Sequence, residues 1–84
     1  MTDKKFEKLG FKKVKDDEYA VEYERKKRLY GYTQVIALCH KKSGRHIIQS
    51  YQKDVNRDGF NNMVGLTSEE AKLCIEKMKQ KGWV

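Results

Sequence analysis

The hydrophobic pattern of this chain changes its period along the sequence, and this change limits the folds that are open to it. Apolar residues alternate with other residues over 19–24, as in a β-strand with one exposed face. Over 71–78 they recur instead at intervals of three and four, as on one side of an α-helix. With 84 residues, we expect a single domain, residues 1–84, with a thin core. The pattern therefore predicts a small α+β fold.

The C-terminal segment predicts a helix over about 67–81. Thr67 is placed as the N-cap and Glu70 as the third helical residue, which are the two halves of a capping box. Gly82 suits the position that ends the helix, and Trp83 can fold back on the last turn. The expected buried stripe consists of Ala71, Cys74, Ile75 and Met78.

The N-terminal segment predicts a shorter helix of one or two turns. Phe6 and Leu9 share a face, and Gly10 followed by Phe11 repeats the glycine–aromatic pair at the C-terminus. A helix this short is not stable alone in water. We therefore expect it to pack on the rest of the domain through these apolar residues.

Three or four antiparallel strands are expected between the two helices. Residues 19–24 form the first strand, Val35–Cys39 is apolar on both faces and suits a central strand, and Arg45–Tyr51 follows. Phe11–Lys15 is the candidate for a fourth, edge strand. The predicted fold is a short N-terminal helix, a three- to four-stranded antiparallel sheet, and a C-terminal helix packed on one face.

A two-residue loop at Ser43 and Gly44 would fix the pairing of the last two strands. In that register His40 faces Ile47 and Lys41 faces His46. The two histidines then lie on opposite faces, which argues against a two-histidine metal site. The face expected beneath the C-terminal helix carries Ile36, Leu38, His40, Ile47, Gln49 and Tyr51.

Positive charge is concentrated in one region. The formal net charge is +7, and Arg25 to Lys53 contains eight basic residues and no acidic residue. A basic surface with exposed aromatic rings can bind phosphates and stack on unpaired bases. A solvated sheet edge guarded by lysines against aggregation would have the same composition. The candidate nucleic-acid-binding residues are Arg25, Lys26, Lys27, Arg28, Tyr30, Tyr32, Lys41, Lys42 and Arg45.

Motifs for catalysis or for a cofactor are not found in the sequence, so a non-enzymatic module without cofactor or metal is expected. Asp54-Val-Asn-Arg-Asp-Gly59 matches the first six positions of an EF-hand calcium loop, but position twelve is Gly65 instead of glutamate. Cys39 and His40 are neighbours on a strand, so their side chains point to opposite faces and cannot form a dyad.

The composition also indicates a cytoplasmic protein without a membrane partner. No stretch approaches the roughly 18 apolar residues that a membrane span needs, and the first residues lack the apolar core of a signal peptide. Cys39 and Cys74 lie in apolar contexts, as expected for two reduced core thiols.

The order of helix, three strands and helix is similar to that of double-stranded-RNA-binding domains. Gly65-Leu-Thr-Ser-Glu-Glu-Ala-Lys72 resembles the start of their second helix. Those domains carry lysines for the phosphates where this chain has Glu69 and Glu70. The resemblance therefore implies the topology and not that mode of RNA binding.

Both ends of the chain resemble small phage and prophage proteins of Gram-positive bacteria. The matching segments are Phe6-Glu-Lys-Leu-Gly-Phe11 and the helix from Leu66-Thr-Ser-Glu-Glu70 to Gly82-Trp83. This resemblance implies an accessory or host-modulating role. Two partners thus stay open: DNA or RNA, bound through residues 25–53 with low sequence specificity, or a host protein.

Overall fold

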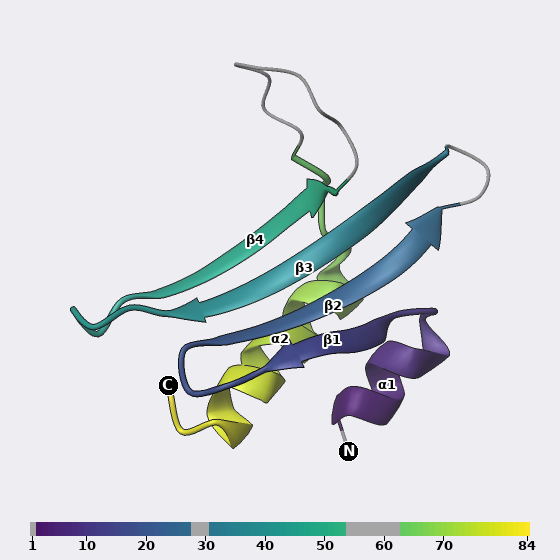
Figure 1. Ribbon diagram of the computed structural model, residues 1–84. Coiled ribbons are helices and arrows are strands. Elements are labelled where there is room, and N and C mark those ends of the chain that lie inside the picture. Colours follow the sequence, from purple (N-terminus) through teal and green to yellow (C-terminus); the bar gives the residue numbers. More distant parts are fainter. Residues whose placement is uncertain (1, 28–30, 54–62) are drawn as a thin grey trace, which may run out of the picture.

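The computed structural model describes residues 2–27, 31–53 and 63–84, except for the side chain of Lys27. The four strands form one antiparallel sheet in the order β1-β2-β3-β4, so each strand pairs with its neighbour in the chain. Both helices lie on the same face of this sheet (Figure 1). The elements are α1 (Thr2–Lys8), β1 (Lys12–Asp16), β2 (Ala20–Lys27), β3 (Tyr32–His40), β4 (His46–Gln52) and α2 (Ser68–Gln80).

This architecture confirms the predicted α+β fold, including the fourth strand at the edge. β1 is interrupted by a bulge between Lys13 and Lys15, and Val14 is exposed there. Among the described residues, no helix is long and apolar enough to cross a membrane.

Helix α2 begins and ends where its capping residues predict. The Thr67 hydroxyl accepts the N–H of Glu70, and the Glu70 carboxylate accepts the N–H of Thr67, both at 3.1 Å. At the other end, the N–H of Trp83 donates to the carbonyl of Met78 at 2.9 Å, and Gly82 has a φ of +76°. This is the Schellman arrangement, which needs a left-handed residue directly after the helix.

Helix α1 ends in the same way, and this places its aromatic residues in the core. The N–H of Phe11 donates to the carbonyl of Phe6 at 3.0 Å. The Phe6 ring stacks on Tyr23 with centroids 4.0 Å apart and meets Phe11 edge to face at 5.7 Å. The core cluster comprises Phe6, Phe11, Val21, Tyr23, Ile36, Leu38, Leu73, Cys74 and Met78.

The predicted buried stripe of α2 is wrong in part. Ile75 is 43% exposed, while the buried residues of the helix are Glu70, Leu73, Cys74, Lys77 and Met78. Two charged residues lie in the buried stripe because each has an ionic partner: Glu70 pairs with Arg25 and Lys77 with Asp3. Hydrophobicity alone cannot assign such positions to the core.

The predicted register of the β3–β4 hairpin is also wrong, by one residue. The N–H of Lys41 donates to the carbonyl of Arg45 at 2.8 Å, which leaves a three-residue loop in which Gly44 has a φ of +86°. His40 therefore pairs with His46 instead of Ile47. This shift moves the side chains of β4 to the other face.

On the helix side of the sheet, the residues of β3 are those expected, and only the residues contributed by β4 differ. Ile36 and Leu38 face the helices as predicted, but their partners in β4 are Ser50 and Ile48. Ile47, Gln49 and Tyr51 pair with the residues of β3 that face away from the helices, so they lie on the opposite, open face.

Candidate functional site

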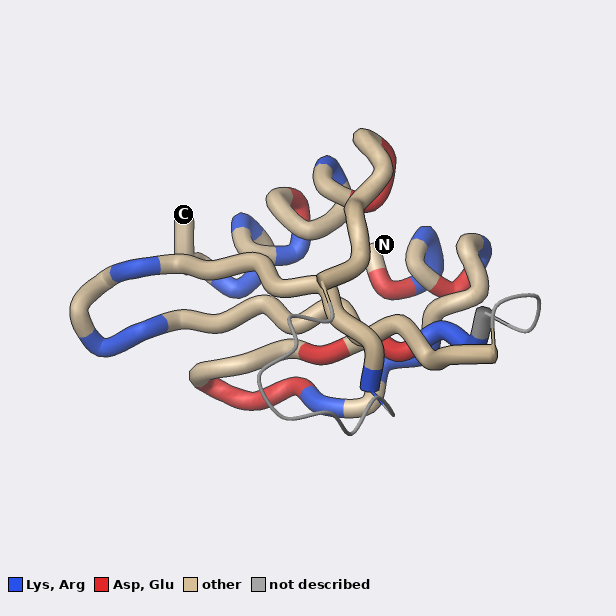
Figure 2. The backbone as a smooth tube through the Cα atoms, turned by 90° about the horizontal axis from the view of Figure 1, so that it is seen from above, with Lys and Arg blue, Asp and Glu red and all other residues tan. Residues whose placement is uncertain are grey.

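The candidate nucleic-acid-binding residues separate into two groups at opposite ends of β3. Lys41, Lys42 and Arg45 lie at its C-terminal end, in the loop to β4. Arg25 and Lys26 pair with residues at the N-terminal end of β3. Nine residues of strand separate the groups by roughly 26 Å, and Figure 2 shows this separation along the sheet. The described candidates therefore do not form the single surface that was expected over residues 25–53.

Arg25 belongs to the interior of the protein. Its guanidinium donates to the Glu70 carboxylate and to the Gln34 side-chain oxygen, both at 2.9 Å. It also donates to the carbonyl of Leu9 at 2.9 Å and lies 4.2 Å from the centroid of the Phe11 ring. These contacts join α1, β2, β3 and α2, so Arg25 stabilises the fold and is not available to a ligand.

The other candidates at this end are less constrained. Lys26 is exposed and pairs in register with Thr33 on the open face of the sheet. Lys27 pairs through its backbone with Tyr32, which is half-buried. Arg28 and Tyr30 lie outside the described residues.

The open face of the sheet carries acidic as well as basic residues. Glu22 and Glu24 face Ala37 and Val35 across β2 and β3. The Lys53 ammonium lies 2.9 Å from the Glu24 carboxylate. The charge count over residues 25–53 missed these two acids because they precede that region in sequence but share its surface.

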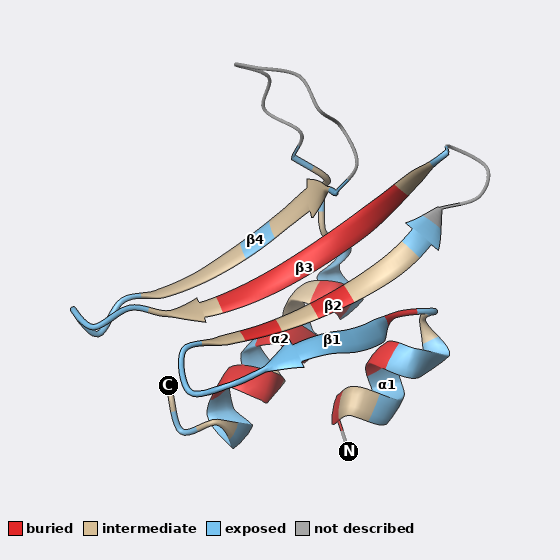
Figure 3. Ribbon diagram, viewed as in Figure 1, coloured by how far each residue is buried: buried red, intermediate tan, exposed pale blue. Residues whose placement is uncertain are grey.

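Exposed cations also lie at the end that we call the hairpin end, residues 40–46 together with Lys81 and Trp83. Lys41, Lys42 and Arg45 are exposed there, and none of the described carboxylates lies within ion-pair distance of them. The hairpin projects beyond the turn between β1 and β2 (Figure 1). Figure 3 shows that this tip is exposed, whereas the middle of β3 is buried.

Three rings form the base of the hairpin end. The Nδ1 atoms of His40 and His46 lie 3.1 Å apart, and the two imidazole planes are 14° from parallel. The Trp83 ring is nearly parallel to both, with centroid distances of 5.3 and 6.4 Å. The sequence indicated Trp83 only as a helix-ending residue. The contact between the histidines was not predicted, because the expected register placed them on opposite faces.

Acidic residues beside this base are held by internal partners. The Asp16 carboxylate lies 2.7 Å from the Lys81 ammonium, and hydrogen bonds from Lys81 and Lys13 lower the pKa of Asp16 despite partial burial. The Asp17 carboxylate accepts the N–H groups of Tyr19 and Ala20, which lowers its pKa as well. Positive charge at the protruding tip is therefore only partly offset by this turn.

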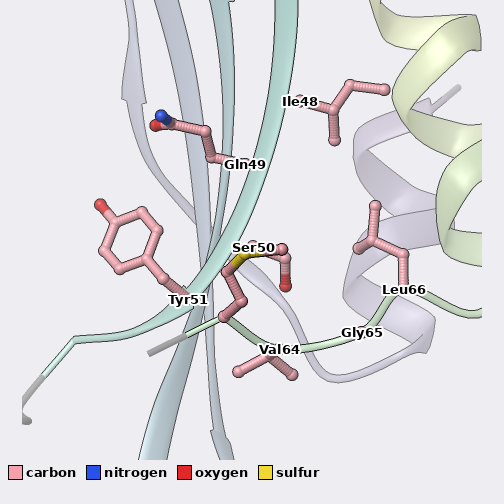
Figure 4. A pocket seen from close by; sticks show the side chains of 8 residues that line it. Ile48, Gln49, Ser50, Tyr51, Val64, Gly65 and Leu66 are labelled. Atoms are coloured by element: carbon pink, nitrogen blue, oxygen red, sulfur yellow. The ribbon is translucent and has the colours of Figure 1, made fainter. Parts of the chain in front are cut away.

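A second surface feature is a groove beside β4. It has a volume of about 650 Å³ and lies between β4 and residues 63–66. In Figure 4, Ile48 and Leu66 lie on the helix side of the strand, and Gln49 and Tyr51 point away from it. The N–H of Val64 donates to the carbonyl of Ser50 at 2.9 Å, so part of the outer edge of β4 is already covered. The groove is lined by Ile48, Gln49, Ser50, Tyr51, Met63, Val64, Gly65 and Leu66.

The described residues offer little for metal binding or catalysis. Within them, no group of three or more His, Cys, Asp or Glu side chains is arranged to hold a metal ion. Burial raises the pKa of the Cys74 thiol to about 12, so this cysteine is not a nucleophile at neutral pH. The EF-hand-like segment from Asp54 to Gly59 lies outside the described residues.

The comparisons with known proteins add no functional information. No family model, no curated protein and no solved structure matches this chain. Function is therefore inferred from the geometry of the hairpin end and of the β4 edge.

Proposed function

We propose that this protein is a non-enzymatic module that binds the phosphate backbone of nucleic acid through its hairpin end, with low sequence specificity. The observation that carries the proposal is the state of Lys41, Lys42 and Arg45. All three are exposed on a protruding loop closed by backbone hydrogen bonds, and none pairs with a carboxylate in the described part of the chain. Such cations can exchange small counterions for phosphates without breaking an internal contact.

Basic residues that already have a carboxylate partner illustrate the difference. Arg25, Lys77 and Lys81 each lie within 2.7 to 3.1 Å of a carboxylate. To bind phosphate, these residues would have to leave a partner that the fold already provides. The hairpin cations carry no such penalty, and all three lie within five residues on one protruding loop, so a polyanion can contact them together.

The shape of the hairpin favours a duplex over a single strand. A two-stranded β-ribbon is narrow enough to enter the major groove of B-DNA. The loop itself, Lys41 to Arg45, contains no aromatic residue on which an unpaired base could stack. Contacts from lysine and arginine to phosphates position a protein on the duplex without reading its sequence.

The test is the triple variant Lys41→Ser, Lys42→Ser, Arg45→Ser, measured by fluorescence anisotropy with a labelled DNA duplex at several salt concentrations. We expect wild type to bind at low salt, and the variant to lose most of that affinity. The log–log salt slope should fall by about three, one for each lost phosphate contact.

A matched control removes the same number of charges elsewhere. Lys4, Lys8 and Lys12 are exposed and lie within ion-pair distance of none of the described carboxylates, so their replacement by serine lowers the net charge equally. The control should retain most of the binding. Equal losses in both variants would mean that net charge alone attracts the duplex, and no binding by wild type would refute the proposal.

A second candidate function is protein interaction at the β4 edge, as in a host-modulating phage protein. β4 is an edge strand without a charged residue, and the apolar groove lies beside it. An extended peptide could add there as a further strand. The variant Met63→Arg, at an exposed position of the groove, should abolish capture of such a partner, with weak salt dependence, and leave binding of the duplex unchanged.

Either function fits the cytoplasm. Both cysteines are free thiols, and thiols stay reduced in that compartment. Nucleic acid and host proteins are both present there.

A further inference from the structure

The only two histidines of the chain meet in a single contact at the base of the hairpin. Their Nδ1 atoms lie 3.1 Å apart. A hydrogen bond between two imidazole nitrogens needs an N–H donor on one ring and a lone pair on the other. The contact therefore requires that at least one of the two Nδ1 atoms carry no proton.

We propose that the His40–His46 pair is a proton-operated switch that regulates the hairpin end. The first proton can add to an outer Nε2 atom and leave the contact intact. The second must add to the accepting Nδ1, which places two N–H groups and two positive charges against each other and breaks the contact. The open form of the pair therefore carries two more positive charges than the neutral pair.

The groups around the two imidazoles affect how easily the pair gains protons and which residue reports its opening. Trp83, which follows the last turn of α2, covers both rings. The Lys81 ammonium is 5.8 Å from the Trp83 ring centroid and opposes the second proton, but it is paired with Asp16 of β1. Hydrogen bonds from Lys81 lower the pKa of Asp16, so this carboxylate keeps its negative charge beside the pair.

The remaining neighbours are the two cations next to the histidines in sequence. Lys41 follows His40, and Arg45 precedes His46. Neighbouring residues on a strand point to opposite faces, so these cations flank the pair and do not lie against the imidazole nitrogens. From the turn before β2, the backbone carbonyl of Tyr19 accepts the N–H of His40 at 2.8 Å.

Opening of the pair should strengthen phosphate binding, and this part of the inference rests on the proposed function. A phosphodiester keeps its charge throughout the titration range of histidine, so only the protein changes. A polyanion that binds the doubly protonated form better must, by linkage, also favour proton uptake. The opening itself, and its effect on Trp83, do not depend on nucleic acid.

Trp83 is the only tryptophan of the chain and reports on the contact directly. We would record its emission from pH 7.5 to pH 5.5 for wild type and for His46→Gln, whose side chain is polar but cannot gain a charge. Wild type should show a shift of the emission maximum to longer wavelength, and the variant should show none. Far-UV circular dichroism at both ends of the range checks that each protein stays folded.

The same two proteins are then tested with the labelled duplex at constant salt. Wild type should bind about fivefold or more tightly at pH 5.5 than at pH 7.5, and His46→Gln should change by less than about twofold. An emission shift without any duplex binding would refute the proposed function and the regulation of affinity, but support the switch. No shift in wild type, or the same shift in both proteins, would overturn the switch. Equal affinity ratios would overturn its effect on binding.

Discussion

Basic residues lie beside both ends of β3, but they are buried and paired at one end and exposed at the other. At its N-terminal end, Arg25 lies beneath the start of α2 and bonds to Glu70 and Gln34. At its C-terminal end, Lys41 and Arg45 lie on a loop that projects past the rest of the sheet (Figure 1). A count of charges along the chain treats both groups as one basic region. The fold makes one group structural and leaves the other for a ligand.

Arg25 and the hairpin cations differ in role because different parts of the protein cover the two ends of β3. Phe11 and Glu70 reach over Arg25 from the segments that flank the sheet, so its charge is removed from water and must be neutralised. Among the described residues, Trp83 covers the base of the hairpin, and the cations beyond it are exposed. Cover by a helix, and not residue type, decides the role of each cation.

The largest expected loss of stability comes from replacing Arg25, at the N-terminal end of β3. Arg25→Met should reduce the free energy of unfolding by about 3–5 kcal/mol, because it leaves the Glu70 carboxylate buried without its partner. Urea unfolding would measure the loss. The double variant Arg25→Met, Glu70→Met should recover much of it, since no buried charge is then left alone. A loss below about 1 kcal/mol would remove the distinction between the two ends.

Within α2, the loss of stability should depend on whether an apolar side chain is buried, and not on its residue type. Leu73→Ala should cost about 2–4 kcal/mol, because Leu73 belongs to the core cluster. Ile75→Ala should cost less than about 1 kcal/mol, because Ile75 is largely exposed. Equal effects in urea unfolding would contradict the orientation of the helix.

The charged contacts under α1 and α2 should make stability fall in acid. Burial disfavours the charged form of Asp3, but hydrogen bonds from Tyr23, Lys13 and Lys77 outweigh it and lower the pKa of Asp3. The unfolded chain then binds more protons than the folded one, so this stabilisation is complete above the ordinary aspartate pKa. It is lost progressively as the pH falls below about 5.

The measurement is urea unfolding between pH 7 and pH 3. Asp3→Asn should be less stable than wild type at pH 7 and should lose less on acidification. Parallel curves for the two proteins would show that Asp3 contributes nothing to the acid sensitivity. Neither curve should respond to removal of the hairpin cations.

The smallest effect on stability is expected at the uncovered end. Lys41→Ser, Lys42→Ser, Arg45→Ser should change the free energy of unfolding by less than about 0.5 kcal/mol, because exposed charges without partners contribute little. If this triple variant were as unstable as Arg25→Met, the two ends would not differ in role.

Local sequence signals predicted those features that depend on neighbours in the chain. Both helix ends follow from short motifs, and α2 starts and stops within a residue of the predicted 67–81. The four expected strands are also present, with bounds that differ by one to three residues, because the apolar patterns that mark them are local. Lys41, Lys42 and Arg45 were identified as candidates by composition alone.

The predictions were wrong where the structure depends on contacts between residues that are distant in the sequence. Ser43-Gly44 suits either a two- or a three-residue loop, and the difference of one residue reverses every side chain of β4. Glu70 and Lys77 enter the buried stripe because of partners 45 and 74 positions away in sequence. The same limit applies to the site: no local pattern pairs Arg25 with Glu70, or brings Trp83 to the two histidines.

The order of the strands has a consequence for how the protein folds. Every strand pairs with its chain neighbour, so the meander closes only short loops. The contact between Thr2 and Glu76 instead closes almost the whole chain. Short loops form early and long ones late. Contacts that join the helices to the sheet, such as Arg25 to Glu70, should then be largely absent from the transition state, so that their loss accelerates unfolding and hardly slows refolding.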